Sequence, residues 1–288
     1  MGVKLNRRQF LRAGVGLGGA TLVGLAGYSA FVEPEDLQVE RVTVRLPRLP
    51  ERLRGLKIAH ISDLHFAPFT GEREIRAAVE TINALQPDVV AITGDFVSGD
   101  LWRSRRKSAA FIEPCTAILA DLRARFGACA VLGNHDHWTD PARIRHTLEA
   151  RGIHVLVNRS LPIEHDGVRL WLAGVDDAMS RLTNYDVALA GIPGGEPVVL
   201  LAHEPDVADH SVRYPIDLQL SGHSHGGQIR IPGLGAPYLP PLARKYPAGL
   251  YQIGSMSLYT TRGVGVVGLP FRFACPPEIT LIELQARS

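Results

Sequence analysis

The chain contains several short apolar runs, and each run ends at one or a few polar residues. Residues 88–93 form such a run, and the apolar residues between positions 73 and 85 recur at helical spacing. An uninterrupted apolar run of this length predicts a strand that is buried on both faces of a sheet. The order strand, helix, strand predicts an α/β fold, and further buried strands are expected at 57–62, 129–132, 198–202 and 216–220.

Other patterns complete this outline. Residues 39–46 alternate between two faces, which predicts a strand at or near the edge of a sheet. Helices are expected at 107–125 and 141–150, and the second has Asp140 as its cap and Pro141 in its first turn. Shorter strands are expected at 169–173, 257–261 and 278–284. Residues 232–249 hold too many prolines and glycines for regular structure, so a loop is expected there.

The first 32 residues differ from the remainder, which predicts an N-terminal appendage at 1–32 and one domain at 33–288. Residues 6–12 carry the adjacent arginines Arg7 and Arg8, and the uncharged, glycine-rich stretch 13–32 follows. This is the pattern of an export signal, and paired arginines before Phe-Leu are typical of the twin-arginine translocase pathway. An ordinary membrane anchor is the alternative, because about 20 apolar residues can span a bilayer.

The distribution of charged residues indicates which classes of partner to expect. The chain has 31 basic and 29 acidic residues, but four of the basic ones lie within the first 12 positions. The remainder is slightly acidic, which does not suggest nucleic-acid binding. Three cysteines, Cys115, Cys129 and Cys275, lack the spacing of a metal site. They could include one disulfide, although buried thiols are the preferred interpretation.

The polar residues that end the apolar runs are those that bind metals. The carboxyl ends of strands in open α/β sheets share one edge, so side chains that follow different strands can meet there. The candidate ligands are Asp63, His65, Asp95, Asn134, His203, His223 and His225. Seven ligands are too many for one ion but suit two adjacent divalent ions that share a carboxylate. Oxygen and nitrogen donors without cysteine favour Mn²⁺, Zn²⁺ or iron, with the identity left open.

The order of these motifs resembles that of the calcineurin-like metallophosphoesterase family. Asp-x-His, Gly-Asp, Gly-Asn-His-Asp, His and Gly-His-x-His follow one another from residue 63 to residue 225. The resemblance implies a two-sheet β-sandwich flanked by helices. It also implies that Asp63, His65 and His225 hold one ion, that Asn134, His203 and His223 hold the other, and that Asp95 bridges them.

The same resemblance assigns catalytic roles to two residues that are not ligands. His135 would face the substrate and protonate the leaving oxygen or stabilise charge on the phosphoryl group, and Asp136 would orient His135 by accepting a ring N–H. No substrate-binding residue is assigned. Residues 258–265 and 276–279, with His137-Trp138, resemble the family's bacterial branch that has an N-terminal signal or anchor.

The remaining polar residues have simpler interpretations. His60 lies inside a predicted strand, His146 lies inside a predicted helix, and His154, His165 and His210 match no motif. Asp176-Asp177 could approach the metals, but a loop-starting pair is the preferred interpretation. Residues 102–107, Trp-Arg-Ser-Arg-Arg-Lys, could meet an anionic headgroup or a membrane surface, or equally form a solvated helix start.

Three functions follow as hypotheses. The leading one is an exported protein, periplasmic or membrane-anchored and facing outward, that hydrolyses phosphodiester or pyrophosphate bonds, including those of a lipid-linked substrate. Its rival is a UDP-2,3-diacylglucosamine hydrolase of lipid A biosynthesis on the cytoplasmic face of the inner membrane. The positive-inside rule opposes that rival, because the basic N-terminus should stay in the cytoplasm. A non-catalytic binding module on the same fold is the third and is opposed by the complete ligand set.

The loop 232–249 bears on the substrate. It combines Leu234, Tyr238, Leu239, Leu242 and Tyr246 with Arg244 and Lys245. Such a mixture suits a substrate with an apolar portion and an anionic headgroup. A loop that only packs over the edge of the sandwich is the alternative of equal weight.

Overall fold

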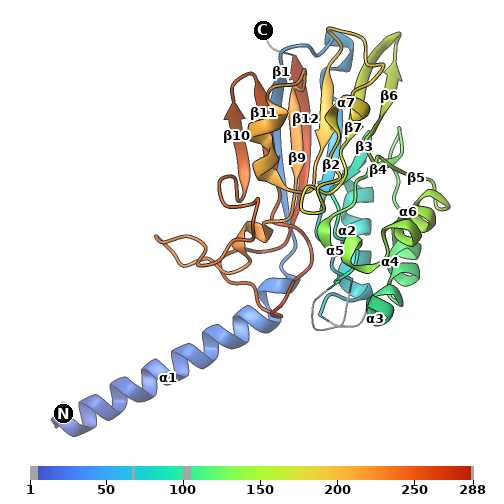
Figure 1. Cartoon of the computed structure of the whole chain (residues 1–288). Coiled ribbons are helices and arrows are strands. Elements are labelled where there is room, and N and C mark those ends of the chain that lie inside the picture. The colour runs from blue at the N-terminus through green and yellow to red at the C-terminus, as the bar shows by residue number, and fades with distance from the viewer. Residues whose placement is uncertain (1–5, 67–68, 100–104, 287–288) are drawn as a thin grey trace.

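Two six-stranded sheets face each other and form the body of the molecule in the computed structural model (Figure 1), which describes residues 6–66, 69–99 and 105–286. The first sheet has the order β1 (Gln38–Leu46), β12 (Glu278–Ala286), β2 (Lys57–Ile61), β3 (Val89–Ile92), β4 (Ala128–Ala130) and β5 (Ile153–Val155). The second has the order β10 (Gly249–Ile253), β11 (Met256–Thr260), β9 (Leu218–Ser221), β8 (Val198–Leu201), β7 (Val168–Gly174) and β6 (Arg159–His165). The expected sandwich is confirmed, and β1 lies at a sheet edge as its alternation predicted.

The central strands of both sheets run parallel, so their carboxyl ends lie together. Strands β2, β3, β4 and β5 pair in parallel, as do β7, β8, β9 and β11. Strand β12 is antiparallel to β2, and β6 and β10 are antiparallel strands at the two edges of the second sheet. The turns after β2, β3, β4, β8 and β9 therefore open toward the same end of the sandwich.

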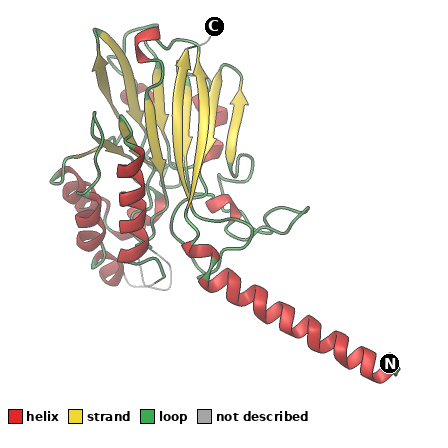
Figure 2. Cartoon of the chain, turned by 180° about the vertical axis from the view of Figure 1, so that it is seen from behind, coloured by secondary structure: helices red, strands yellow, loops and turns green. Residues whose placement is uncertain are grey.

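Helices cover the outer faces of the sandwich (Figures 1 and 2). The first sheet is covered by α2 (Glu72–Leu85), α4 (Ile112–Leu119) and α6 (Pro141–Glu149), with α3 (Arg105–Ala109) and α5 (Asn134–Thr139) beside them. The second sheet carries the short helices α7 (Tyr185–Ala188) and α8 (Ala208–Ser211). Single 3₁₀ turns occur at η1 (Glu33–Glu35), η2 (Glu51–Leu53), η3 (Pro205–Val207) and η4 (His225–Gly227).

The core has three layers because the inner strands are apolar on both faces. In β3, Val89 and Ala91 pack between the two sheets, whereas Val90 and Ile92 pack under the helices. Leu172, Leu201 and Leu220 cover the same interior from the second sheet. The uninterrupted apolar runs correctly predicted strands that are buried on both sides.

One predicted helix is wrong. Residues 107–125 do not form a single helix: α3 ends at Ala109, α4 begins at Ile112, and α4 ends at Leu119. Pro114 lacks an amide proton and so fits only the first turn of a helix, which is where α4 places it. Pro114 therefore marks the start of a second helix within the range 107–125, where one continuous helix was expected.

The N-terminal helix α1 (Arg7–Phe31) projects away from this body (Figure 1). The segment Val15–Glu35 spans 21 residues with a mean hydropathy of 1.5, and 6% of its central window is buried. Among the described residues it is the one helix long and apolar enough to cross a membrane. A span of about 20 residues is the length that crosses the hydrocarbon core of a bilayer.

Candidate dinuclear metal centre

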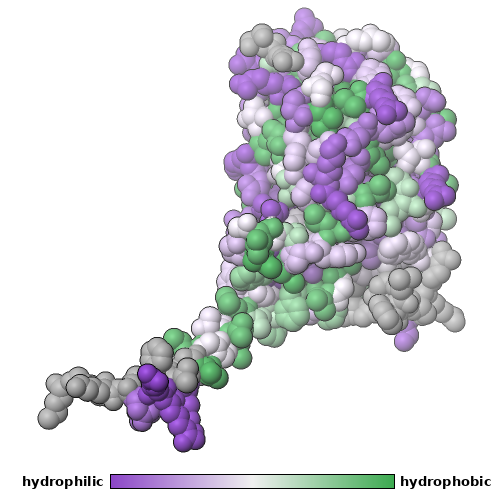
Figure 3. Space-filling model, turned by 60° about the vertical axis from the view of Figure 1, so that its left-hand side comes forward, coloured by the Kyte–Doolittle hydropathy of each residue, from purple (hydrophilic) through white to green (hydrophobic). Residues whose placement is uncertain are grey.

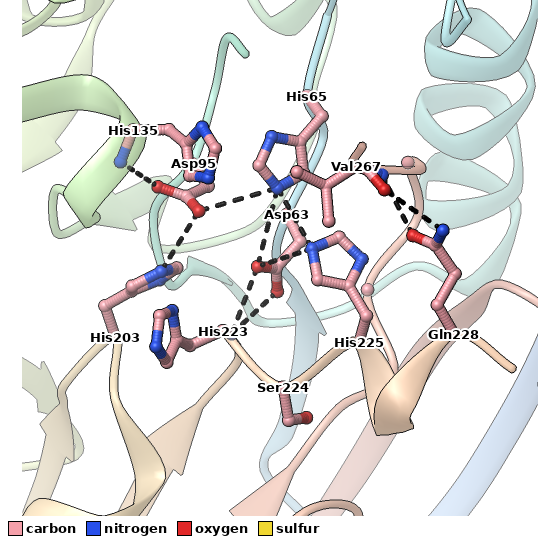
Figure 4. Close-up of polar contacts among 12 residues, drawn as sticks. Asp63, His65, Asp95, His135, His203, His223, Ser224, His225, Gln228 and Val267 are labelled. Carbon is pink, nitrogen blue, oxygen red and sulfur yellow. Dashed lines mark hydrogen bonds and ion pairs between the residues drawn. The ribbon is translucent and has the colours of Figure 1, made fainter. Parts of the chain in front are cut away.

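The turns at the carboxyl ends of the strands bring the predicted ligands together. Asp63 and His65 follow β2, and Asp95 follows β3. His203 follows β8, and His223 and His225 follow β9. All six side chains are buried, with exposures of 6% or less. Strands of both sheets thus contribute to one buried cluster (Figure 4).

One group of donors consists of Asp63, His65 and His225. The Nε2 atoms of the two histidines lie 3.0 Å apart, and Asp63 Oδ1 lies 3.4 Å from His225 Nε2 and 4.0 Å from His65 Nε2. Figure 4 shows the three side chains converging on one point. Two imidazole nitrogens and a carboxylate oxygen at this separation form a set that could hold a divalent ion.

A second group consists of Asp95, His203 and His223. Their donor atoms also lie within 4.8 Å of one another. Asn134 begins α5 directly after the β4 turn, is 2% exposed, and its Oδ1 has no hydrogen-bond partner among the residues described. A buried amide oxygen is costly to leave unpaired, so a cation at this position would satisfy it.

Asp95 lies between the two groups. Its Oδ2 is 3.5 Å from His65 Nε2 and 3.2 Å from His203 Nε2, so one oxygen contacts a member of each group. The other oxygen, Oδ1, accepts the backbone N–H of His135 at 2.9 Å. The Asp95 carboxylate is therefore held between the two donor groups, where a bridging ligand is predicted.

Hydrogen bonds fix which nitrogen of two imidazoles faces the site. His203 Nδ1 donates to the Thr93 carbonyl, and His223 Nε2 donates to the Pro241 carbonyl at 2.9 Å. A carbonyl oxygen only accepts, so the ring nitrogen that faces it carries a proton, and the lone pair of the neutral ring is on the other nitrogen. His203 Nε2 then faces an Asp95 oxygen at 3.2 Å, a contact that either a proton on Nε2 or a bound cation would satisfy.

The electrostatics of the cluster suit metal binding. Burial lowers the pKa of His223 to about 4 and lowers the pKa values of His65 and His225 well below the ordinary value. These rings stay neutral and keep the lone pairs that a metal needs. Burial would lower the pKa of His203 as well, but Asp95 raises it well above the ordinary value. The Asp95 carboxylate thus attracts a cation to the position where a metal would replace the proton.

The ligands are carried on unusual backbone. Asp63, His65, Asp95, His223 and His225 all have positive φ angles, between 44° and 65°. Left-handed backbone at residues other than glycine is costly, and such strain concentrates at functional sites. A Cβ on Gly222 would lie 2.3 Å from Asp63 Oδ2, so only glycine allows the β9 turn to approach this ligand.

His135 occupies the rim of the cluster. Its ring packs edge-on against His65 with the ring centroids 4.6 Å apart, and a ring nitrogen lies within 4.8 Å of donor atoms of His65 and Asp95. Unlike the six buried ligands, His135 is partly exposed. It therefore lies at the edge of the cluster, between the candidate ligands and solvent.

The hydrogen bonds of Asp136 differ from the one that the resemblance implied. Its carboxylate accepts the backbone N–H groups of Asp95 at 2.8 Å, Phe96 at 2.9 Å and Gly133 at 3.0 Å. All of its hydrogen bonds to described residues go to these amides rather than to the His135 ring. Asp136 joins the β3 turn to the start of α5, and it therefore positions Asp95 and His135 through the backbone.

Most of the residues that the sequence analysis did not count as metal ligands lie outside the cluster. His60 is fully buried in β2 and bonds Thr93 Oγ1 at 2.9 Å. His137 Nε2 lies 2.8 Å from Asp176 Oδ1, so this pair joins α5 to the loop after β7. The three cysteines are buried free thiols. Of the segment 102–107, residues 102–104 lie outside the described residues, and residues 105–107 form the start of α3.

Arg272 forms a network beside the cluster that sequence reasoning did not predict. Arg272 is fully buried and donates to the carbonyls of Cys275, Arg262, Gly263 and Gly265. This network shapes the loop that lies against Asp63, where a Cβ on Gly263 would be 2.7 Å from the Asp63 Cβ. A lone arginine in a proline-rich tail carries no motif that would have revealed this.

Comparison with known proteins decides the family. The model for calcineurin-like phosphoesterases matches residues 56–227. The chain belongs to this family. The matched residues contain every predicted ligand, and the calcineurin-like phosphoesterases are hydrolases that depend on two metals.

Three curated relatives of this family are similar over nearly the whole chain. The uncharacterized metallophosphoesterase YkuE of Bacillus subtilis is 34% identical over 98% of this chain and 99% of its own length. Phosphodiesterase YaeI of Escherichia coli is 32% identical over 97% and 99%. UDP-2,3-diacylglucosamine pyrophosphatase LpxG of Chlamydia trachomatis is 29% identical over 89% and 92%. The resemblance seen in the motifs is confirmed.

Proposed function

We propose that this chain is a membrane-anchored phosphoesterase that holds two metals and hydrolyses phosphodiester or pyrophosphate bonds of a lipid-linked substrate. The observation that carries the proposal is the position of Asp95, whose single oxygen lies within 3.5 Å of a histidine from each donor group. Asp63, His65 and His225 would hold one ion, and Asn134, His203 and His223 the other.

Bound divalent ions at adjacent positions would polarise the phosphoryl group and lower the pKa of water. The protein's own residues supply the other contributions to catalysis. The buried ligand shell excludes bulk water, which strengthens electrostatic interactions inside the site. His135, at the rim, donates a proton to the leaving oxygen or stabilises the phosphoryl charge. Asp136 fixes the positions of His135 and Asp95 relative to each other through its three hydrogen bonds to backbone amides.

A panel of phosphoesters tests the activity. Purified full-length protein, stripped of metal and reloaded separately with Mn²⁺, Zn²⁺ or Fe²⁺, should hydrolyse a chromogenic phosphodiester. Including a monoester and a pyrophosphate diester in the panel separates the possible bond types. No hydrolysis with any metal, although two equivalents are bound, would favour the non-catalytic binding module.

The N-terminal helix supports the proposed location. The basic residues Arg7, Arg8 and Arg12 lie at the outer end of α1 and no acidic residue lies among them. The positive-inside rule keeps this end in the cytoplasm, so residues 33–288, the proposed catalytic domain, lie on the opposite side of the membrane. Replacing Arg7 and Arg8 by lysine keeps the charge but removes the arginine pair. We expect the double variant to lose export, and unchanged export would contradict use of the twin-arginine translocase.

LpxG gives the rival substrate, UDP-2,3-diacylglucosamine. A UDP-sugar is a cytoplasmic compound, so this substrate requires the domain to face the cytoplasm. Protease protection of intact spheroplasts distinguishes the two locations. Degradation of the domain by external protease supports the outward-facing enzyme, and full protection supports the lipid A pathway.

A further inference from the structure

We infer that the end of the sandwich that carries the metal centre rests on the membrane that α1 crosses, so that substrate enters from the lipid surface. This inference rests on the proposed membrane anchor. The observations that carry it are the attachment of α1 to the metal-site loops and the exposed apolar residues at the same end of the molecule.

Helix α1 joins the domain without a flexible linker. The carbonyl of Ser29, inside the last turn of α1, accepts the backbone N–H of Arg272 at 2.9 Å. The carboxylate of Glu33 is 3% exposed and accepts the backbone N–H of Cys275. The apolar span Val15–Glu35 includes both residues. The span therefore ends within the domain, and the bilayer surface must lie directly beside these contacts.

The segment that holds α1 also shapes the metal centre. Arg272 and Cys275 belong to the loop between β11 and β12, and Cys275 Sγ lies 3.2 Å from the carbonyl of the predicted ligand His225. Phe273 in the same loop exchanges backbone hydrogen bonds of 2.8 and 3.0 Å with Arg230 and Gln228. The membrane anchor and the ligand turn after β9 are thus held by one short stretch of chain.

Exposed apolar residues continue from this junction. We call them the apolar rim: Phe31, Val32, Ile231, Leu234, Tyr238, Leu242 and Leu269. Their exposed fractions include 77% for Phe31, 83% for Leu234 and 70% for Tyr238. Gln228 ties the two loops of the rim together, because its side chain donates to the carbonyls of Val267 and Leu269 at 3.1 and 2.9 Å.

The surface view agrees with this placement. Figure 3 shows apolar surface where α1 meets the body and along the adjacent end of the body, whereas polar surface predominates farther away. The loop 231–242 extends from the body beside the root of α1 (Figure 1). A contiguous apolar surface is unfavourable in water but favourable at the boundary of headgroups and acyl chains. Continuity with a membrane-spanning helix makes the lipid bilayer the occupant of this surface.

The apolar rim is also connected to the proposed reaction site. Pro241, next to Leu242, accepts the ring proton of His223 at 2.9 Å. A lipid whose acyl chains stay among the rim residues would therefore place its headgroup phosphate near the metals. The loop 232–249 has the role of a lipid-facing surface in this arrangement.

Site-directed fluorescence tests the contact, because the three native cysteines are buried and a single added cysteine can be labelled alone. Leu234→Cys and, as a control, Glu164→Cys on β6 would each be labelled with bimane in the full-length protein. Both proteins would be placed in phosphatidylglycerol and phosphatidylethanolamine vesicles that contain nitroxide-labelled lipid. We expect strong quenching at position 234 and little at position 164. Equal quenching at the two positions would overturn the inference.

A kinetic test uses the variants Leu234→Ser and Leu269→Ser. We expect kcat/KM for a bilayer-embedded phosphodiester to fall severalfold and kcat/KM for a small soluble diester to stay unchanged. Equal losses on both substrates would mean that the rim only supports the fold. Absence of any hydrolysis by the parent protein would contradict the proposed function, while the quenching result would still decide the membrane contact.

Discussion

The two sheets contribute differently to the candidate metal centre. The first sheet supplies both carboxylates, Asp63 and Asp95, and the second supplies only imidazoles, from His203, His223 and His225. The carboxylates are held by backbone N–H donors, since Asp63 accepts from His223 at 3.0 Å and Asp95 from His135 at 2.9 Å. Two of the imidazoles are held by backbone carbonyls.

Several of these supports cross between the sheets. The amide that binds Asp63 follows β9, and the carbonyl that binds His203 belongs to Thr93 after β3. Each sheet therefore orients ligands that the other supplies. The two sheets differ in one respect. Asp95, from the first sheet, contacts both donor groups, whereas each histidine from the second sheet belongs to one group.

Asp95→Asn should give the largest effect, because a neutral amide at the shared position weakens both metal sites. We expect activity to fall to the limit of detection and metal content to drop by more than one equivalent. His203→Ala is the matched control from the second sheet and should retain one equivalent. Elemental analysis of the purified proteins measures both. Loss of less than one equivalent in Asp95→Asn, with activity intact, would refute the bridging role.

His135→Ala should lower turnover by roughly 10²- to 10⁴-fold, the range for loss of a general acid, while metal content stays unchanged. The partly exposed position of His135 is the reason to expect this separation from the buried ligands. The loss should be smallest for substrates whose leaving group needs no proton. A variant purified without metal would show that His135 is itself a ligand.

Gly222→Ala tests the close approach of the second sheet to Asp63. The added Cβ would lie 2.3 Å from Asp63 Oδ2 and 2.0 Å from Ser62 Oγ, so the carboxylate must move. We expect metal affinity to fall about 10- to 100-fold, as for other changes just outside a metal shell. Gly194→Ala, where the added Cβ meets nothing within 4 Å, is the control. Metal competition titration compares the two, and equal affinities would contradict the close approach.

Within the group Asp63, His65 and His225, the pH dependence of metal binding should follow Asp63 rather than the two histidines. Burial raises the pKa of Asp63 to about 6, whereas it lowers the pKa values of His65 and His225 well below their ordinary value. A raised carboxyl pKa means that protons compete with the metal below pH 6, so affinity should fall about tenfold per unit there. Chelator competition between pH 4.5 and 7.5 measures this. A constant affinity across that range would show that Asp63 is not a ligand.

The order of motifs along the chain predicted the family and the sandwich fold, which are confirmed, and a set of candidate ligands, which the structure brings together. Local patterns sufficed because buried strands need uninterrupted apolar residues and because parallel strands place their carboxyl ends at one edge. The turns of five strands could thus be assigned to one site before any distance was known.

Tertiary structure alone decided how those residues are held. Asp136 looked like a partner of the adjacent His135, but its carboxylate binds three backbone amides, including those of Asp95 and Phe96 after β3. Arg272 carries no motif, yet it organises the loop that joins α1 to the metal centre. Hydrogen bonds of this kind link residues distant in sequence and depend on side-chain direction, which apolar periodicity does not encode.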